Sequence, residues 1–404
     1  MRAFRIKDVA RINRRLLPEE TDPEYRFKYI DISAVDGLGG VTIPDDEITF
    51  SVAPSRARRL APPGAVVVST VRTYLRAIAA VPAAEIPLVF STGFAVLEAG
   101  PHIDARFLAH YCRSQVFVDE VAARSTGVSY PAINPREIGC LPIILPKLEE
   151  QRRIADFLDA EVGKLDSIVR SRALQYKLLN ERIDSQVVDI IGRSELAAPD
   201  VGIPMVAMRW LLQKVMRATA ETSEVVTAFR DGQVTARSMR RVEGYTNSAS
   251  AEPQGQEVLV GDIVVHGLDG FAGAIGASEA AGNCSPVYHV MIPRGASDSL
   301  YYGRLLRILA LQGYLTGFSH STRERAFDFR NWDMFGRIPL PVAHENEQRR
   351  IGDQIRMVTP LRSKLTQFSE RITERSQALI TAAVTGQFDV STAGGSNVTE
   401  GITV

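Results

Sequence analysis

The sequence predicts a mixed α/β (α+β) protein with a pseudo-twofold internal repeat. Two similar globular domains are separated by two long helices, which pack as an antiparallel coiled coil. The motif Glu-Gln-Arg-Arg-Ile occurs at residues 150–154 and again 197 positions later at 347–351. Each copy follows a proline-marked strand end and opens about forty residues of helical pattern. This repeat distance is far longer than the roughly 20–50 residues of a solenoid. The chain is therefore expected to contain two copies of one unit, a globular domain followed by a long helix.

Composition excludes several classes of protein. Among 404 residues, 45% are hydrophobic and 23% are charged, which is ordinary for globular domains. No stretch approaches the roughly 18 apolar residues of a membrane span. The N-terminus lacks the apolar core of a signal peptide, so we expect a cytoplasmic protein. Three cysteines without CxxC spacing favour buried free thiols over a disulfide framework or a zinc site: Cys112, Cys140 and Cys284.

The charge pattern carries a weak signal for nucleic acid. There are 47 basic and 47 acidic residues, so no global positive field attracts a polyanion. Seven of the basic residues are Lys and all the others are Arg. Arginine suits bidentate contact with guanine and phosphate, although GC-rich coding produces the same bias.

Residues 1–146 are predicted to be the first domain. Apolar spacing indicates an amphipathic helix over 5–17 and a second helix over 104–121. Alternating or β-branched runs indicate strands at 27–32, 65–70, 87–91, 94–97 and 141–145. Turns follow the first strand at Asp36-Gly37 and Gly39-Gly40.

Residues 203–341 retrace this order and are predicted to be the second domain. Residues 207–209 echo 3–5, the Gly261 step echoes Pro63-Gly64, and 286–291 echo the strand at 94. The helix at 301–315 corresponds to that at 104–121, and 321–325 take the place of 125–127. Similar scaffolds with divergent loops are typical of recognition surfaces.

The spacer helices are predicted at 147–192 and 342–390, with a linker at 193–202 and a disordered tail at 391–404. Apolar residues repeat every 3.5 positions over four or more heptads, which favours a coiled-coil seam. Pro360 predicts a kink or a restart in the second helix. The predicted seam comprises Leu158, Val162, Leu165, Val169, Tyr176, Leu179, Ile183, Ile351, Val358, Leu365, Phe368, Ile372 and Leu379.

No catalytic motif is found. Gly163-Lys164 lies in the coiled-coil pattern and is not a phosphate-binding loop, and the turn at Gly37 lacks the strand–helix context of a dinucleotide site. Asn134-Pro135 lacks the second proline and the aromatic residue of a methyltransferase loop. The six histidines show no zinc spacing. We therefore expect no catalytic residue and no metal site in this chain.

The predicted surface loops instead carry arginine with hydroxyl, amide and aromatic residues. Arg can read guanine and Asn or Gln can read adenine, while hydroxyls and further Arg residues hold phosphates. Any one of these Arg residues alone is more often a solvated charge, but the clusters recur in both domains. In the first domain the candidates are Arg56, Arg58, Arg59, Arg72, Tyr74, Arg76, Ser125, Thr126, Ser129, Tyr130 and Asn134. In the second they are Arg230, Gln233, Arg237, Arg240, Arg241, Tyr245, Asn247, His320, Thr322, Arg323, Arg325 and Asn331.

With these features the sequence resembles the specificity subunit of type I restriction–modification enzymes. The two proline-marked strand ends running into EQRRI carry the resemblance, together with the long helices and the variable domain before each copy; it covers residues 1–390. It implies that the domains are target-recognition domains, each reading one half of a split DNA site, while the coiled coil sets their spacing. It further implies two methyltransferase subunits and motor–nuclease restriction subunits as partners, which would bind S-adenosylmethionine, ATP and Mg. Pro360 and the Arg323-Glu324-Arg325 loop depart from a symmetric pattern.

Two other functions remain open from the sequence. One is a duplicated coiled-coil scaffold that binds only protein, and the other is a DNA enzyme with an unrecognised site.

Overall fold

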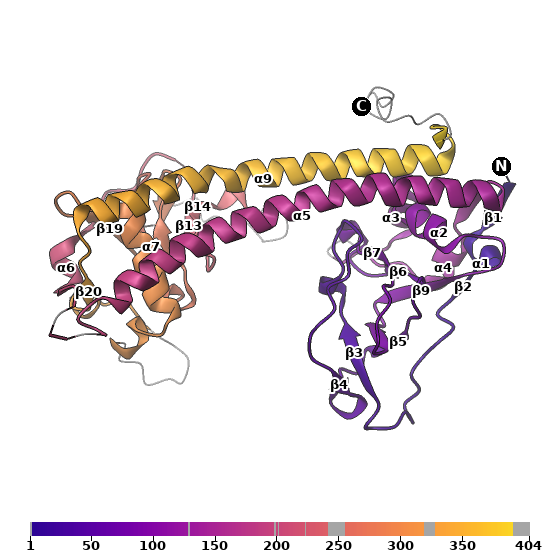
Figure 1. Cartoon of the computed structure of the whole chain (residues 1–404), viewed down its shortest axis with the longest axis horizontal. Coiled ribbons are helices and arrows are strands. Elements are labelled where there is room, and N and C mark those ends of the chain that lie inside the picture. Colours follow the sequence, from indigo (N-terminus) through magenta and orange to yellow (C-terminus); the bar gives the residue numbers. More distant parts are fainter. Residues whose placement is uncertain are drawn as a thin grey trace. The chain divides into compact units, whose positions relative to one another are not determined.

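The structure, a computed structural model, describes residues 2–127, 130–197, 199–200, 202–222, 224–240, 255–318 and 328–390. The chain forms two compact units, the first of residues 1–171 with 366–404 and the second of residues 172–365. Both units include part of each long helix, α5 (Leu148–Gly192) and α9 (Glu345–Thr385) (Figure 1). Because the long helices are shared in this way, the division does not test the predicted domain boundaries, which remain predictions.

Unit 1 contains two four-stranded sheets and one short strand pair. The first sheet has the order β2-β9-β6-β7 and is antiparallel: β2 (Ala10–Ile12), β9 (Phe94–Ala99), β6 (Val66–Ser69), β7 (Ile78–Ala80). The second is mixed, with β3 parallel to β8, in the order β4 (Ile48–Thr49), β3 (Arg26–Ile30), β8 (Leu88–Ser91), β5 (Ala57–Leu60). The strand pair is β1 (Arg2–Arg5) with β10 (Pro142–Leu145). The predicted strands at 27–32, 65–70, 87–91, 94–97 and 141–145 are therefore present, with shifted ends.

The first sheet is buried on both faces. Val66 and Val68 point into the core made with the helices, whereas Val67 points into a second core shared with β8. Alternation along a strand sends neighbouring side chains to opposite faces. This explains why the run at 65–70 is apolar without a break, as expected of a strand covered on both sides.

The predicted helix over 5–17 is wrong beyond its first turn. Only α1 (Ile6–Val9) is helical, and the chain then pairs as β2, with Ala10 opposite Ala99 of β9. Apolar residues at 6, 9, 10 and 12 fit a helical face and also a single turn followed by an edge strand, and tertiary pairing selects the strand.

The predicted helix over 104–121 is broken into α2 (Ala105–Arg113) and α3 (Gln115–Arg124). Ser114 is extended, ends α2 and caps α3 by accepting a hydrogen bond from the Phe117 amide. A helix that the sequence pattern missed, α4 (Pro135–Cys140), precedes the closing strand, with Asn134 and Glu137 forming its capping box.

Unit 2 repeats the first sheet and the short strand pair of unit 1. Its antiparallel sheet has the matching order β12 (Leu212–Val215), β19 (Tyr288–Pro293), β16 (Ile263–His266), β17 (Ile275–Ala277). Its short pair is β11 (Met205–Ala207) with β20 (Pro339–Pro341), followed by α6 (Met208–Leu211). In place of the mixed sheet stand two pairs, β13 (Val226–Ala228) with β14 (Val234–Ala236), and β15 (Gln256–Val258) with β18 (Gly282–Cys284). The helices of this domain are α7 (Ser299–Leu311) and α8 (Trp332–Phe335).

One predicted equivalence between the halves needs correction. Ala207 pairs with Pro339 as Arg5 pairs with Pro142, so residues 207–209 correspond to 5–7 and not to 3–5. The match of the Gly261 step to Gly64 holds, because both glycines have positive φ and each leads into the central strands. The halves thus share the order of the antiparallel sheet and the short strand pair, which confirms the predicted fold class.

The two long helices pack against each other within each unit. In unit 2 Arg193 is paired with Glu347 at 2.7 Å, and Tyr176 accepts a hydrogen bond from Arg362 at 3.1 Å. The partner number rises as the α5 number falls, so the helices are antiparallel there. In unit 1 Leu158 and Val162 of α5 share a buried cluster with Leu379 and Ile380 of α9.

Burial along the predicted seam is uneven. Leu158, Val162, Val169, Ile183, Ile351, Val358 and Leu379 are buried, and Leu165, Tyr176, Leu365 and Ile372 are half-buried. Leu179 and Phe368 are exposed, and each belongs to the heptad row that polar residues interrupt. Helix α9 is continuous through Pro360, so it does not restart there.

The glutamine of the first EQRRI motif joins α5 to its domain. Gln151 is only 1% exposed, and its Nε2 donates to the carbonyl oxygens of His102 at 3.2 Å and Pro146 at 3.0 Å. Its Oε1 accepts from the backbone amide of Asp104 at 2.9 Å. Asp104 is the N-cap of α2, so one side chain ties the start of α5, the end of β10 and the start of α2 together.

Gln348 repeats this arrangement in unit 2. It is 2% exposed, donates to the carbonyl of Ala343 at 2.8 Å and accepts from the amide of Asp298 at 3.4 Å. Asp298 is the N-cap of α7. Of the paired arginines in the motif, Arg350 donates to Gln186 of α5 at 2.8 Å. Arg152, Arg153 and Arg349 are exposed and form no ion pair with a described residue.

Two of the three cysteines are buried free thiols, Cys112 and Cys284, and burial raises the pKa of Cys284 to about 12. Cys140 is exposed, so the expectation of three buried thiols is wrong at this position. No helix in the described part of the chain is long and apolar enough to span a membrane.

Candidate nucleic-acid interface

Two loops of unit 1 that carry predicted DNA-binding residues are joined by backbone hydrogen bonds. The first runs from Val71 to Arg76, and the second is the segment before α4. Arg72 donates its amide to the Pro131 carbonyl at 2.8 Å, and Ile133 donates to the Thr70 carbonyl at 2.9 Å. The hydroxyls of Thr73 and Ser125 lie 3.0 Å apart. The candidates at 72–76 thus lie beside the described candidates at 125–126 and 130–134.

We call residues 72–76 the arginine turn. It is a single 3₁₀ turn, η3 (Thr73–Leu75), and its flanking residues Arg72 and Arg76 are both left-handed, with φ of 51°. Of the described non-glycine residues, only these two and Asn13 have positive φ. Such a conformation costs about 1–2 kcal/mol for an L-residue, and strain of this kind gathers at functional sites.

The tip of the arginine turn exposes large side chains. Tyr74 is 58% exposed and Leu75 is 46% exposed. The guanidinium carbon of Arg72 lies 4.9 Å from the centre of the Tyr130 ring, which is itself 65% exposed. This cation–π contact holds the guanidinium plane in place and leaves its N–H edge accessible.

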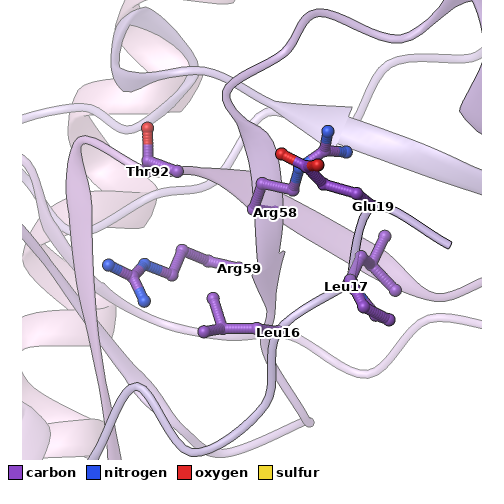
Figure 2. A pocket seen from close by; sticks show the side chains of 7 residues that line it. Leu16, Leu17, Glu19, Arg58, Arg59 and Thr92 are labelled. Atoms are coloured by element: carbon purple, nitrogen blue, oxygen red, sulfur yellow. The ribbon is translucent and has the colours of Figure 1, made fainter. Parts of the chain in front are cut away.

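A second group of arginines lies on β5 of the mixed sheet and directly before it. Arg56 is paired with Asp31 at 3.0 Å, and the Arg58 guanidinium lies 4.6 Å from the Phe50 ring centre. Arg59 is half-buried, its Nε is buried without a hydrogen-bond partner among the described residues, and burial lowers its pKa. Figure 2 shows Arg58 and Arg59 extending in different directions from this strand.

An open pocket of about 550 Å³ adjoins these arginines. Its lining is more apolar than an ionic site would be: Leu16, Leu17, Pro18, Glu19, Arg58, Arg59 and Thr92 (Figure 2). The pocket can accept a flat or apolar group beside two cations.

The turn at Thr92–Gly93 links the two arginine groups. Thr92 donates its amide to the Arg56 carbonyl at 2.8 Å, and Gly93 accepts from the Thr70 amide at 2.8 Å. A Cβ on Gly93 would lie 2.8 Å from Cδ1 of Ile32, so a larger residue here would require the Ile32 side chain to shift. The arginines at 56–59 and the strand end before the arginine turn are therefore joined by hydrogen bonds to this turn.

Three other candidates in the first domain have structural partners. Asn134 caps α4, accepting from the Arg136 amide at 2.9 Å, and Ser125 donates to the Val121 carbonyl at 2.8 Å. Thr126 exchanges backbone hydrogen bonds with Ala132. Their DNA contacts stay predictions, as does that of Ser129, which lies outside the described residues.

In the second domain the described candidates are mostly engaged with acidic groups. Arg230 is paired with Asp269 at 3.0 Å, and Arg240 with Asp231 at 2.9 Å. Gln233 donates to Glu279 at 2.7 Å. The others are Arg237, 3.4 Å from the Thr227 hydroxyl, and Asn331, the N-cap of α8. Outside the described residues lie Arg241, Tyr245, Asn247, His320, Thr322, Arg323 and Arg325.

Sequence reasoning missed two features of this surface. One is the apolar tip residue Leu75, and the other is the Thr92–Gly93 turn that joins the loops. The internal repeat held a signal for the turn that carries Leu75. A shift of 197 places Arg76 opposite Gly273, and glycine is typical of turns. The described residues hold no group of three His, Cys, Asp or Glu side chains that could bind a metal ion.

Comparison with known proteins gives a family match for the first part of the chain. Residues 1–170 match the family model described as the type I restriction modification DNA specificity domain. The search of curated proteins found no match.

Solved structures resemble the chain over nearly its whole length. One, described as the structural basis of complex assembly and conformational transition of the type I R-M system, is 23% identical with a TM-score of 0.55, covering 96% of this chain and 98% of that chain. The HsdS subunit from Thermoanaerobacter tengcongensis is 22% identical, with a TM-score of 0.43 and coverage of 96% and 97%. The type I restriction-modification S subunit from M. genitalium is 14% identical, with a TM-score of 0.48 and 95% coverage of each chain. The first of these supports the fold.

Proposed function

We propose that the whole chain is the specificity subunit of a type I restriction–modification system, because residues 1–170 match the model of the type I restriction modification DNA specificity domain. Each domain reads one half of a bipartite DNA sequence, and α5 with α9 sets the distance between the halves. The subunit itself is non-catalytic in this proposal.

The observation that carries the proposal is the repeated fold. The sheet order β2-β9-β6-β7 of the matched domain recurs as β12-β19-β16-β17 in the second domain, and both domains end in a glutamine-tied long helix. A duplicated DNA-reading domain is suited to a target with two separate halves.

The helices suit the role of a spacer. At 1.5 Å per residue, the 45 residues of α5 and the 41 residues of α9 are about 68 and 62 Å long. Two reading elements on one face of B-DNA must be placed a helical turn, about 34 Å, or a multiple of it apart. Paired helices hold such a distance more closely than a flexible linker, whose end-to-end distance varies.

Partner subunits complete the proposal. Two methyltransferase subunits bind this chain and bring S-adenosylmethionine, and motor–nuclease subunits bring ATP and Mg for restriction in the cytoplasm. The zero formal net charge supports a role for partner subunits in DNA binding, since those subunits would then supply much of the attraction to phosphates. We expect weak and strongly salt-dependent DNA binding by this chain alone.

The test is to co-express the chain with the methyltransferase subunit of its own system and to map methylated adenines across the genome. The expected result is one bipartite motif with a fixed gap. Replacing residues 1–146 by the corresponding domain of a system with another target should change one half of the motif and leave the gap and the other half unchanged. A continuous motif, or methylation that is independent of this chain, would contradict the proposal.

A nuclease or a protein-only scaffold predicts different outcomes. A nuclease would cleave DNA as the purified single chain with Mg. A scaffold would keep its function when the loops at 124–134 and 320–331 are exchanged for unrelated loops.

A further inference from the structure

We infer that the arginine turn, with Tyr130 beside it, is the base-reading element of the first domain, and that the equivalent turn of the second domain has no such role. This rests on the proposed function and deepens it, because it names the residues that read one half-site. Arg72 reads a guanine, the Tyr74–Leu75 tip contacts the adjacent base, and Arg76 holds a backbone phosphate.

The second domain contains the same turn, which serves as an internal comparison. In each domain the strand that lies third in the sheet order, β6 or β16, is followed by a 3₁₀ turn, η3 or η5 (Gly270–Ala272). Ile133 donates to the Thr70 carbonyl in the first domain, and Phe329 donates to the Gly267 carbonyl in the second. The two turns therefore occupy the same place in the fold.

The residue that closes the turn is glycine in the second domain and arginine in the first. Gly273 closes η5 with φ of 89°, and glycine adopts this conformation without a steric penalty. Arg76 closes η3 in the same left-handed region, where its Cβ is disfavoured. Because the fold accepts glycine at this place, folding alone does not require arginine here.

The residue that opens the turn differs in backbone and in charge. Asp269 precedes η5 with φ of −105° and is paired with Arg230. Arg72 precedes η3 with φ of 51° and, like Arg76, forms no ion pair with any described residue. The turn of the first domain thus presents two cations without an ion-pair partner among the described residues, whereas that of the second begins with a carboxylate that Arg230 neutralises.

The exposed groups around Arg72 match the edge of a base pair. A planar guanidinium with a free N–H edge donates to O6 and N7 of guanine in the major groove. The Tyr130 ring restricts the Arg72 side chain before DNA arrives, so less conformational freedom is lost on binding. Exposed Tyr74 and Leu75 offer apolar contact to a thymine methyl group or a base face.

Two other arginines of this domain, Arg56 and Arg59, fit the role less well. Arg56 is already neutralised by Asp31, and Arg59 is half-buried against the apolar pocket. Arg59 stands on β5 and Arg56 directly precedes it, whereas the arginine turn projects Tyr74 and Leu75 outward between its two cations. The geometry therefore favours residues 72–76 over the cluster at 56–59 for base reading.

The experiment uses the complete chain with its methyltransferase subunit. Methylated adenines are mapped, and binding to a duplex with the wild-type motif is measured at several salt concentrations, for the wild type and for Arg72→Ala, Arg72→Lys and Arg76→Gly. Asp269→Asn, in the equivalent turn, is the matched control. Thermal unfolding of each variant reports on its folding.

Arg72→Ala should relax the motif at one guanine–cytosine position of a single half-site, with about tenfold to hundredfold weaker discrimination there. Arg72→Lys keeps the charge and loses the planar fork, so it should relax the same position while keeping most of the affinity. Arg76→Gly should weaken binding to all sequences and lower the salt slope by about one, yet raise the unfolding temperature because the strain is removed. Asp269→Asn should leave the motif unchanged.

The outcomes separate this inference from the proposed function. A wild-type chain without a bipartite motif refutes the proposed function itself. A wild-type bipartite motif that survives unaltered in both Arg72 variants overturns only the inference. If Arg72→Ala unfolds, Arg72→Lys decides alone, because it retains the charge and the aliphatic stem.

Discussion

Replacement of Gln151 by alanine probes how a reading domain is held to its helix. The side-chain amide is buried and makes three hydrogen bonds, two donated to the His102 and Pro146 carbonyls and one accepted from the Asp104 amide. Those backbone groups are part-buried or buried and lose a protein partner in the variant.

The expected loss of stability follows from these contacts. A buried polar group left without its partner costs about 1–3 kcal/mol, and water that enters the vacated space offsets part of it. Three such groups, with the lost packing, suggest about 2–4 kcal/mol for the first unit. That corresponds to a fall of very roughly 5–15 °C in unfolding temperature for about 200 residues.

Two measurements test the value. Differential scanning calorimetry of the full chain gives the transition that shifts, and hydrogen exchange followed by mass spectrometry localises the change. Peptides that contain residues 102–113 and 146–160 should lose protection, whereas peptides of the second domain should keep it. Gln367→Ala on the exposed face of α9 is the surface control, with a change below about 0.5 kcal/mol.

Gln151→Met separates hydrogen bonding from packing. Methionine has a similar length and cannot make the three hydrogen bonds, so it should destabilise the first unit nearly as much as alanine. Gln348→Ala should cost less, because one of its hydrogen bonds is long at 3.4 Å. Wild-type stability of Gln151→Met would refute the reasoning.

Three further substitutions test other parts of the structure. The pKa of Asp159 is lowered, chiefly by its hydrogen bond to His110 and then by Arg106. The stability that the Asp159 carboxylate contributes is therefore present above about pH 4 and is lost as pH falls through the lower folded pKa. In urea titrations Asp159→Asn should be less stable than wild type at pH 7 and equally stable near pH 2. Pro360→Ala should stabilise α9 by about 1–3 kcal/mol, and a lower unfolding temperature would argue that the helix needs proline there. Asp262→Asn, which weakens the pair of this buried carboxylate with the half-buried Arg217, should cost about 1.5–3 kcal/mol in thermal unfolding, and a loss no larger than that of Asp269→Asn, at a half-buried residue, would contradict this.

The two-domain architecture could be predicted from the sequence because strand composition and helix periodicity are local patterns that recur in both halves. The runs at Val66 and Ile263 are β-branched and apolar because their strands are covered on both faces. The heptad rows without polar breaks are the rows that are buried or half-buried, as the row Val162, Val169, Tyr176 and Ile183 illustrates. The early helix was wrong because four apolar positions near residue 10 suit a helix and an edge strand equally, and the choice depends on β9, some 85 residues away.

The sequence by itself determined the architecture, since strand composition, helix periodicity and the duplicated motif are local patterns. Only the tertiary structure decided which loop residues stand together and which charges are free. In the folded chain, carboxylates distant in sequence neutralise Arg56 and Arg230. Arg72 and Arg76 form no ion pair with a described residue and flank a strained turn, where the Tyr130 ring contacts the Arg72 guanidinium. The physical reason is that hydrogen bonds and ion pairs depend on distance in space, and the partners of Gln151 or Arg56 lie tens of residues away along the chain.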